Sequence, residues 1–433
     1  MRDMGRNSRL CFAILSVSLL GATTRQLRAT VNDWPQFRGV HRDGRSADTG
    51  LLKEWPKEGP LLVWRINGLG RGYSGVSVAG DRIFTMGDRN KVQWVIALDR
   101  ATGQEAWSTP IGAEWPDGGP RCTPTIDGQN LYALGPHGDL VCLTTDTGKL
   151  IWRKSLPQDF GGAMMSGWGY SESPLVDGDK LICTPGGKDA AMVALDKKNG
   201  HLLWKAALPD IGARGHDGAG YSSIVISKAG GIRQYVQMMG RGVVSVAADN
   251  GRFLWGYNRI ANGTANITSP MVADDYVFCT TSYGTGSALL QLTSTSDKKG
   301  IQAHEVYFLE GGEFQNHHGG VVLVDGYLYG GHGQNAGSPT CIEMKTGKIL
   351  WKQRGPGGGS ASVTYADGHL YFRYEDGVMA LIEATPKELK VKSTFKLPTH
   401  DGPSWPYPVI AGGLLYLRHG DSLLCYDLRV RQH

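Results

Sequence analysis

Short apolar runs separated by glycine turns follow one another along most of the chain. Residues 97–107 show the pattern clearly: an Ala-Leu-Asp strand, a tight Thr-Gly turn, and a second strand that begins close to a tryptophan. Runs of this length, bounded by turn residues, are typical of β-strands. The pattern returns at residues 143–152, 195–204, 246–255 and 342–351.

The spacing of these segments indicates a repeat. Their turn glycines are Gly103, Gly148, Gly200, Gly251 and Gly347. The steps between them are 45 (148 − 103), 52 (200 − 148), 51 (251 − 200) and 96 (347 − 251) residues. Because the last step is twice the others, it contains one diverged copy. A period near 50 residues indicates a repeat architecture, which has to be recognised before any single motif is interpreted.

Two further patterns give the number of repeats. The first is small-Pro-x-Val-x-Gly-x-x-Leu-Tyr, which predicts two strands joined by a tight turn. It occurs at residues 74–84, 123–132, 173–182, 222–235, 269–278, 320–329, 362–371 and 408–416. The strand led by an aromatic residue occurs at Trp64, Trp107, Trp152, Trp204, Trp255, Tyr307, Trp351 and Phe395. The Leu-Asp strand occurs at Leu98, Leu143, Leu195, Val246, Leu290, Ile342, Leu381 and Leu424. All three counts give eight.

Each repeat therefore holds four strands, A to D, and four-stranded antiparallel units at this period are blades of a β-propeller. The sequence predicts an all-β, eight-bladed propeller over residues 64–428, after an N-terminal extension at 30–63 and before a tail at 429–433. The Trp64 strand precedes the first A strand, and the chain ends on a C strand. We therefore expect the Trp64 strand to complete the last blade and remove the open edges.

The first 29 residues read as an export signal. Arg2, Arg6 and Arg9 precede the apolar run 10–22, which is too short to span a bilayer, and Ala29 offers a cleavage point. We expect a periplasmic or extracellular protein with no transmembrane span once the signal is removed. Residues 1–29 hold five Arg and one Asp, so +4 (5 − 1) of the net charge of +5 lies in them. The near-neutral remainder excludes a nucleic-acid partner, and we expect a monomer.

Six cysteines follow the signal, and an exported protein could use them in disulfides. Cys142, Cys341 and Cys425 occupy the position that Ala97 and Ala194 hold in other repeats, so they lie in different blades. We expect small buried thiols. Cys122 with Cys142 is the one pairing within a single repeat.

Function is expected on one face of the propeller, which we call the top face. The A–B and C–D turns at the bottom are short and repetitive, whereas the B–C and D–A loops at the top are long, irregular and rich in polar and aromatic residues. Long loops on a rigid scaffold are where binding residues concentrate. The candidate ligand-binding residues of this face are Arg71, Tyr73, Arg121, Trp168, Tyr170, Tyr221, Arg241, Asn266, Asn316, His317, His318, His332, Arg373 and Trp405.

Several chemistries are open to these loops. His216, Asp217 and Glu172 could form acid–base pairs, or could be ordinary polar loop residues. A metal could bind near His317, His318 and His332. Adjacent histidines on a strand point to opposite faces, however, so a hydrogen-bonded lining is the alternative.

Trp168 and Trp405 lie outside the repeat positions. They could stack on a flat cofactor, a sugar or a peptide, or could anchor their loops.

The repeated Ala-x-Asp-x-x-Thr-Gly-x-x-x-Trp pattern resembles the tryptophan-docking repeat of the eight-bladed quinoprotein propellers. It also resembles their cofactor-free relatives, which include the bacterial outer-membrane assembly lipoprotein. The opening residues 33–39, with Arg42-Asp43-Gly44, are similar to secreted bacterial proteins that carry this PQQ-like domain. The resemblance covers about residues 33–428. It is specific for the fold, because the superfamily contains both enzymes and scaffolds.

The resemblance implies two functions. Quinoprotein dehydrogenases hold PQQ at the top mouth, bind calcium through a Glu and an Asn, and use an Asp as the base. Glu172 and Asn266 are of the right type for calcium, and Asp217 for the base, although no local motif assigns them and the chain lacks the adjacent cysteines common in these enzymes. One hypothesis is therefore a PQQ- and calcium-dependent dehydrogenase of an alcohol or sugar. The favoured hypothesis is a secreted binding or scaffold module that recognises a protein or glycan through its top face.

Overall fold

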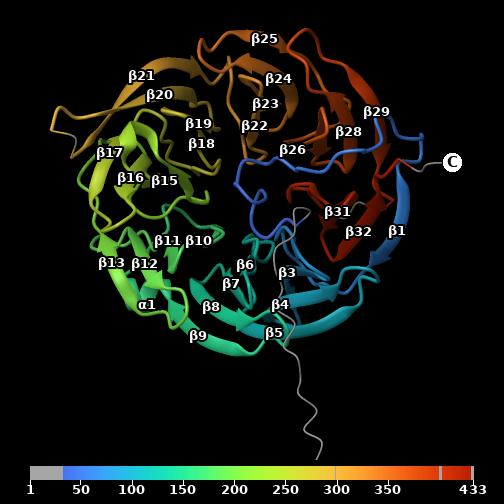
Figure 1. The fold of residues 1–433 in the computed structure, drawn as a ribbon, viewed down its shortest axis with the longest axis horizontal. Helices are drawn as coiled ribbons and strands as arrows, with labels where there is room; N and C mark the ends of the chain where they lie inside the picture. The colour runs from blue at the N-terminus through green and yellow to red at the C-terminus, as the bar shows by residue number, and fades with distance from the viewer. Residues whose placement is uncertain (1–32, 298, 399–401, 431–433) are drawn as a thin grey trace, which may run out of the picture.

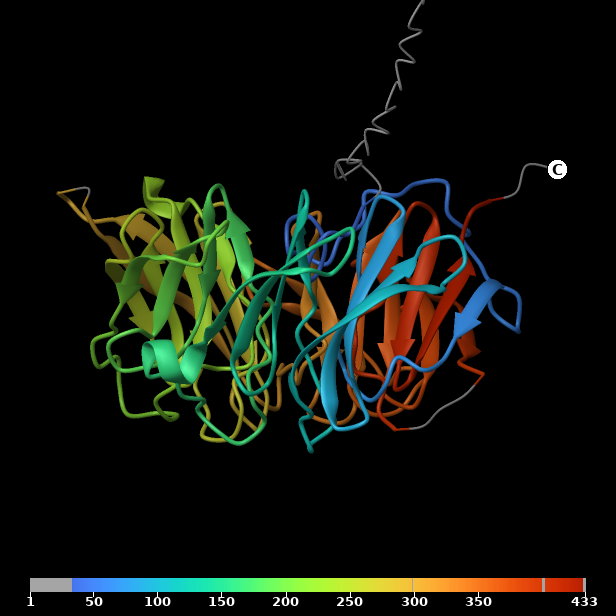
Figure 2. The same cartoon turned by 90° about the horizontal axis from the view of Figure 1, so that it is seen from below.

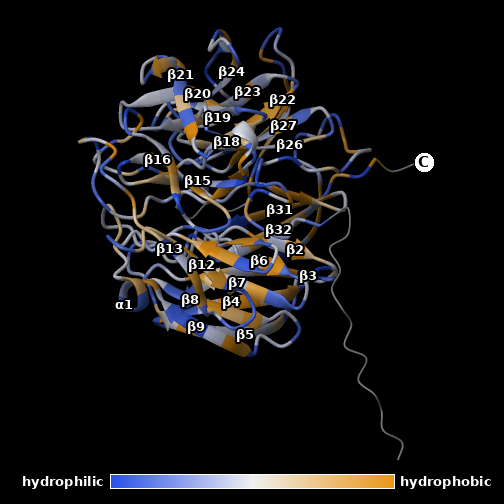
Figure 3. Ribbon diagram, turned by 60° about the vertical axis from the view of Figure 1, so that its left-hand side comes forward, coloured by the Kyte–Doolittle hydropathy of each residue, from blue (hydrophilic) through white to orange (hydrophobic). Residues whose placement is uncertain are grey.

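The computed structural model is a ring of eight four-stranded antiparallel blades, as the sequence predicts (Figure 1). It describes residues 33–297, 299–398 and 402–430. The expected export signal at 1–29 lies outside the described residues. The strands of the blades carry much of the hydrophobic colour in Figure 3, because each blade buries both of its faces against its neighbours.

In seven blades the strands run in chain order from the central channel to the rim, and in the last blade the first strand of the chain, β1, is the outer strand. The first four blades are β2 (Ser77–Ala79), β3 (Arg82–Arg89), β4 (Val92–Asp99), β5 (Glu105–Ala113); β6 (Thr125–Asp127), β7 (Asn130–Leu134), β8 (Asp139–Thr144), β9 (Leu150–Ser155); β10 (Leu175–Asp177), β11 (Lys180–Cys183), β12 (Met192–Asp196), β13 (Leu202–Ala206); and β14 (Val225–Ser227), β15 (Gln234–Met239), β16 (Gly242–Ala247), β17 (Phe253–Tyr257).

The other four blades are β18 (Met271–Ala273), β19 (Tyr276–Thr281), β20 (Gly286–Ser294), β21 (Ile301–Glu310); β22 (Val321–Val324), β23 (Tyr327–His332), β24 (Ser338–Glu343), β25 (Ile349–Lys352); β26 (Ala361–Ala366), β27 (His369–Tyr374), β28 (Val378–Glu383), β29 (Val391–Lys396); and β30 (Val409–Ala411), β31 (Leu414–His419), β32 (Ser422–Asp427), β1 (Leu61–Ile66). The helices of the described chain are α1 (Leu156–Phe160) and the 3₁₀ turn η1 (Ala229–Gly231).

The last blade closes the ring by joining the two ends of the chain. β1 pairs antiparallel with β32, and Trp64 lies opposite Cys425, so the expected closure is confirmed. Gly59, just before β1, packs against the ring of Phe395 in the preceding blade. This glycine takes the position that a C–D turn glycine holds elsewhere, although here the chain is not continuous between the C and D strands.

The blades are joined by an aromatic side chain of one outer strand that lies over the turn glycine of the next blade. Trp107 Nε1 donates a 3.1 Å hydrogen bond to the carbonyl oxygen of Thr145, and its ring covers Gly148. Trp152 donates in the same way to Lys197. A Cβ atom at Gly148 would lie 2.4 Å from the Trp107 ring, so only glycine fits. The residue that recurs in the turn is therefore required by the neighbouring blade.

Small side chains lie opposite these aromatic residues within each blade. Trp107 is opposite Ala97, Trp152 is opposite Cys142, and Trp351 is opposite Cys341. In each of these pairings the register shifts by one residue directly after the small residue. All six cysteines of the described chain are buried free thiols, which confirms the expectation from their repeat positions.

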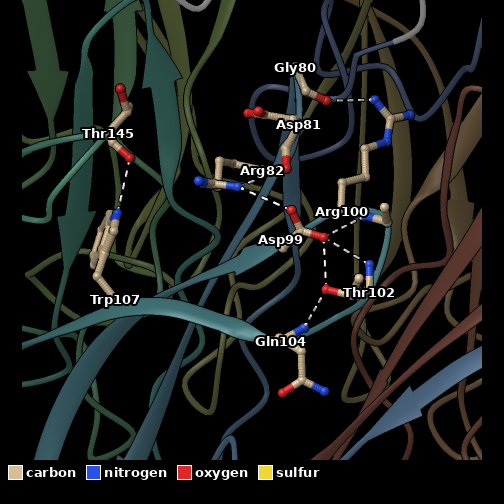
Figure 4. A network of polar contacts seen from close by, with 10 residues as sticks. Gly80, Asp81, Arg82, Asp99, Arg100, Thr102, Gln104, Trp107 and Thr145 are labelled. Atoms are coloured by element: carbon tan, nitrogen blue, oxygen red, sulfur yellow. Dashed lines mark hydrogen bonds and ion pairs between the residues drawn. The ribbon is translucent and has the colours of Figure 1, made fainter. Parts of the chain in front are cut away.

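The Asp-x-x-Thr-Gly turn satisfies its own backbone (Figure 4). The Asp99 carboxylate accepts hydrogen bonds from Ala101 N and from both the backbone N and the hydroxyl of Thr102, at 2.8–3.1 Å. Arg100 points the other way and donates to the carbonyl oxygens of Gly80 and Ala411. The turn thus connects the first blade to the last.

Residues 33–48, which we call the N-terminal segment, lie across the bottom of the central channel. Figure 1 shows this segment in blue near the centre of the ring, and in Figure 2 it lies on the upper side of the disc, with the top face pointing down. Trp34 pairs with Val78 of β2, Arg45 with Tyr365 of β26, and Ser46 donates to Ile410 O of β30. These contacts join the segment to the inner strands of three neighbouring blades, the seventh, the eighth and the first.

Arg42 fixes the middle of this segment. Its guanidinium group is buried and donates to the carbonyl oxygens of Ser173, Pro174 and Ile224, and to the side chain of Gln36. These three carbonyl oxygens lie directly before the inner strands β10 and β14, and a guanidinium group with five donors satisfies all three at once. The sequence predicted an extension that leads into the propeller. It gave no indication that the extension fills the channel.

We predict that Gly148→Ala destabilises the protein more than Gly128→Ala, a turn glycine of the same blade. Both glycines have positive φ, at 70° and 59°, which costs an alanine about 1–2 kcal/mol. Only Gly148 faces a neighbouring ring, because nothing lies within 4 Å of a Cβ at Gly128. Overpacking against Trp107 adds about 1–3 kcal/mol. The free energy of unfolding of both variants is measured by urea denaturation. Equal losses of stability in the two variants would show that the contact of Gly148 with Trp107 adds nothing to the cost of the substitution.

Candidate functional site

The top face holds one well-formed cavity of about 340 Å³ at the mouth of the channel. Its wall comes from loops of several blades, and its floor comes from the N-terminal segment. The lining residues are Trp34, Phe37, Arg38, Tyr73, Gly75, Val76, Asp117, Arg121, Thr123, Trp168, Ser171, Tyr221, Ser223, Ala265, Ile267, Tyr283, His317, His318, Trp405, Pro406, Tyr407 and Val409. We call this space the top-face cavity.

Seven of the fourteen candidate top-face residues line this cavity. They are Tyr73, Arg121, Trp168, Tyr221, His317, His318 and Trp405. All seven lie in D–A loops, between an outer strand and the inner strand of the next blade. These loops end beside the channel because the A strand that follows each of them lines it.

Five of the rings form a continuous series, which we call the aromatic belt. The ring centroids lie 5.3 Å apart between Tyr283 and His317, 4.2 Å between His317 and His318, 4.9 Å between His318 and Trp405, and 4.4 Å between Trp405 and Tyr73. Rings at these separations attract one another and stiffen the wall. The belt presents an extended apolar surface to the cavity.

The two histidines lie together, contrary to the expectation for a strand. Only Asn316 forms a bridge, and His317 and His318 follow it in a bend, so their rings do not alternate across a sheet. His317 bonds to the Ser360 hydroxyl at 2.9 Å and to the Tyr283 hydroxyl at 3.0 Å. Burial lowers the pKa of His317, and that of His318 well below its usual value. Both imidazoles are therefore neutral at pH 7.

Three charged side chains line the cavity, those of Arg38, Asp117 and Arg121. Arg121 stands over the Tyr73 ring at 5.7 Å and donates to the carbonyl oxygens of Trp168, at 3.0 Å, and Asp117, at 2.9 Å. Arg38 lies in the floor and is 2 % exposed. Trp168 packs edge-on against Tyr221, whose hydroxyl bonds to Ser166 at 2.7 Å.

The two asparagines of the candidate set hold their own loops. Asn266 donates to the carbonyl oxygens of Met239 and Gly240 at 3.0 and 2.9 Å. Asn316 donates to those of Gly320 and Gly331 at 3.2 and 2.9 Å. Both asparagines are fully buried. Their amide groups supply hydrogen bonds to backbone carbonyl oxygens of the buried loops, which would otherwise have no partner.

Glu172 lies inside the propeller beside Arg42. Its carboxyl group accepts hydrogen bonds from the backbone N of Thr184 at 2.7 Å and from the Thr184 hydroxyl at 3.1 Å. Burial raises the pKa of Glu172 to about 8, while these bonds and Arg42 oppose the rise. The carboxyl group is therefore protonated at neutral pH and does not line the cavity.

The remaining candidates also lie outside the cavity lining. Tyr170 donates to Pro185 O at 2.9 Å, and Arg373 donates to Pro406 O at 2.9 Å and Arg418 O at 2.6 Å. His332 accepts from Gln315 N, and burial lowers its pKa to about 4. The surface candidates are Arg71, beside Glu114 at 3.8 Å, and exposed His216, with the exposed ion pair Arg241–Asp217.

The calcium pair implied by the resemblance does not fit a calcium site. Calcium requires several oxygen ligands that face a common point. The oxygens of Glu172 and Asn266 are instead bonded within the protein, and Glu172 is protonated at neutral pH. Within the described ranges no group of three or more His, Cys, Asp or Glu could hold a metal ion.

The lining residues that sequence reasoning missed include Trp34, Phe37, Arg38, Asp117 and Tyr407. Tyr407 lies two residues after Trp405, and its ring meets Phe37 edge-on at 5.5 Å. The first three belong to the non-repeating opening motif at residues 33–39. Its dense mixture of aromatic, arginine and glycine residues was the available signal.

Comparison with known proteins places the chain in a family. A family model described as outer membrane protein assembly factor BamB matches residues 91–353 and, in a second match, 305–390. Together these matches span residues 91–390, or 300 (390 − 91 + 1) of the 433 residues. The chain belongs to the BamB family.

Curated relatives of this BamB-family chain include two enzymes. It is 24 % identical to tetrathionate hydrolase of Acidithiobacillus ferrooxidans over 352 residues, which cover 78 % of this chain and 56 % of the relative. It is 31 % identical to the quinoprotein alcohol dehydrogenase PedH of Pseudomonas putida over 120 residues, which cover 25 % of this chain and 19 % of the relative. The chain thus spans about half or less of the length of the curated relatives that it matches.

Solved structures share the fold. BamB from Moraxella catarrhalis aligns with a TM-score of 0.57 at 15 % identity, over 86 % of this chain and 98 % of that chain. Quinohemoprotein alcohol dehydrogenase from Comamonas testosteroni aligns with a TM-score of 0.63 at 12 % identity, over 93 % and 81 % of the two chains. At these identities the likeness shows the fold alone. No helix in the described part of the chain is long and apolar enough to cross a membrane.

We predict that Glu172→Gln removes a pH-dependent loss of stability. The pKa of Glu172 is about 8 in the folded protein against 4.5 as its reference value, so unfolding releases a proton between these pH values. Wild-type stability from this group is complete below pH 4.5 and falls until about pH 8, by a few kcal/mol in order of magnitude.

Gln does not titrate and can keep the bonds to Thr184. The variant should therefore match the wild type at pH 5 and exceed it at pH 9, as measured by denaturant unfolding at both values. A difference that stays constant with pH would contradict a buried, protonated Glu172.

Proposed function

We propose that the chain is an exported binding module that recognises its partner through the top face, with the top-face cavity as the anchoring site. The partner is a protein or a glycan that inserts a flat group, or a free small ligand with a flat face. The aromatic belt is the observation that carries this proposal. Rings from blades far apart in sequence meet there and offer one continuous surface to a planar group.

The polar groups support binding better than acid–base chemistry. Asp217, His216 and Glu172 lie outside the cavity lining. A general base needs to reach the proton that it removes, and none of the three candidates adjoins the aromatic belt. The family description, an outer membrane protein assembly factor, is consistent with a binding role.

Export and a location outside the cytoplasm are part of the proposal. They rest on the basic and apolar pattern of residues 1–29 and on the BamB family. As a module with one concave site per ring, the protein would act as a monomer.

We predict that flat-ring probes bind the cavity. 2-Naphthoate, its neutral analogue 2-naphthamide, and cellobiose are titrated while tryptophan fluorescence and the melting temperature are followed. A probe at a hundredfold excess over its Kd stabilises the fold by about 2.7 kcal/mol. Tyr73→Ala and Trp405→Ala should each weaken binding roughly three- to tenfold, since each removes one member of the belt.

Trp115→Ala is the matched control, because Trp115 packs on His137 and lies outside the cavity lining. Absence of binding by every probe would overturn the proposal. The dehydrogenase hypothesis is tested separately, by following the reduction of a redox dye in the presence of an alcohol. Dye reduction that depends on both PQQ and Ca²⁺ would show that the protein is a catalyst and not a binding module.

A further inference from the structure

The bottom face carries an open groove of about 490 Å³ beside the N-terminal segment, which we call the bottom groove. One wall is formed by residues 36 and 40–43 of this segment. The other wall is formed by the inner strands β10, β14 and β18 of three successive blades, together with the turn at Gly178. The groove therefore lies on the opposite face from the top-face cavity.

The inner strands have an edge that faces the channel and pairs with no other strand of the blade. In β2, Val78 exchanges two hydrogen bonds of 2.8 and 2.9 Å with Trp34 across this edge. In β26, Tyr365 accepts from Ser46 N at 2.8 Å and donates to Gly44 O at 2.9 Å. The last residue but one of these inner strands thus presents its N–H and C=O to the channel, where backbone of the N-terminal segment pairs with them.

Val176 of β10 and Val272 of β18 hold the same place in their strands. Each lies opposite the residue five positions later, as Val78 lies opposite Ile83 and Val176 opposite Leu181. Hydrogen-bonding direction alternates along an antiparallel strand, so the same place in the hairpin gives the same direction. Within the described ranges no hydrogen bond joins the N-terminal segment to Val176 or Val272, and both residues line the bottom groove.

The burial of these residues agrees with the path of the segment. Val78 and Ile410, which hold this place in β2 and β30 and are bonded to the segment, are 0 and 1 % exposed. Val176 and Val272 are only partly buried. The blades of β10, β14 and β18 therefore lack a cover that the segment supplies elsewhere in the ring, and that cover is extended peptide backbone.

Charge at the bottom groove favours a basic side chain. Of its charged lining residues, Arg42 donates to backbone carbonyl oxygens, and Arg233 forms an ion pair with Asp177. Asp43 is partly buried, and its Oδ1 atom accepts a 3.1 Å hydrogen bond from Arg45 N. It forms no ion pair with any residue that the structure describes. The groove thus holds one carboxylate without a counter-charge, and a cation of the ligand can supply it.

We propose that the bottom groove binds an extended segment of a partner protein that carries a lysine or an arginine. The backbone of this segment pairs with Val176 and Val272, as the N-terminal segment pairs with Val78, and its basic side chain lies against Asp43. Addition of an extended peptide to an open sheet edge is a recurring mode of recognition. This interaction is independent of the top-face cavity and goes beyond the proposed function.

The test uses one peptide and two analogues, which are titrated calorimetrically against the whole protein. The probe is acetyl-Thr-Val-Lys-Val-Thr-amide. An analogue with every backbone nitrogen methylated keeps the side chains but loses the donors, so it should bind roughly tenfold or more weakly. An analogue with norleucine in place of lysine should bind roughly two- to fivefold more weakly, as expected for the loss of a partly exposed ion pair.

Val272→Pro removes one N–H from the channel-facing edge of β18, a position where proline is tolerated. It should weaken binding of the probe roughly two- to tenfold, the effect of one hydrogen bond. Leu323→Pro is the matched control, because Leu323 holds the same place in β22 but lies outside the groove lining, and it should leave the affinity unchanged. Should Val272→Pro fail to fold, Asp43→Asn, which keeps an acceptor for Arg45 N, should remove the preference for lysine over norleucine.

Amide exchange, followed by NMR, identifies the occupant. In the free protein the N–H groups of Val176 and Val272 should exchange rapidly and that of Val78 slowly, and the probe should slow the first two. Slow exchange of Val176 and Val272 without peptide would show that the chain itself fills the groove, or a second copy where the protection rises with protein concentration. Either result would overturn the proposal, as would absence of binding by the probe or equal binding of its methylated analogue. None of these results bears on the top-face cavity.

Discussion

The packing of an outer-strand aromatic ring on the turn glycine of the next blade is the contact on which this structure depends. A single blade leaves both faces apolar, so it is stable only between neighbours. Trp107 over Gly148 and Trp152 over Gly200 each connect the rim of one blade to the bottom turn of the next. The contact requires a residue without a Cβ, and positive φ at these glycines adds a second reason for glycine. The repeat in the sequence is therefore the repeat of a contact between blades.

Closure extends the same contact around the whole ring. Phe395 packs on Gly59, and Trp64 packs on Gly103, so the two chain ends reproduce what a continuous turn provides elsewhere. A closed ring leaves a channel whose inner strands expose carbonyl oxygens. The N-terminal segment satisfies many of them through Arg42 and shuts the lower end. The top-face cavity exists because the channel is closed below and open above.

The fold could be predicted because three patterns repeat eight times and agree. The position of the N-terminal segment could not, because residues 33–48 occur once and their partners, such as Ser173 and Val321, are more than a hundred residues away. The site was predicted only in part. Tyr73 and Asn266 both lie in D–A loops, and sequence alone does not distinguish a ring that lines the cavity from an amide that holds a buried backbone. The orientation of His317 and His318 relative to each other could not be predicted, because the chain bends there instead of continuing as a strand.

Arg42, Arg373 and Arg418 are buried cations in the interior of the propeller. Burial lowers the pKa of Arg42 to about 10 and those of Arg373 and Arg418 to about 9, so all three remain charged at neutral pH, while Glu172 is protonated. Each of these cations lies against backbone carbonyl oxygens, which stabilise charge without neutralising it.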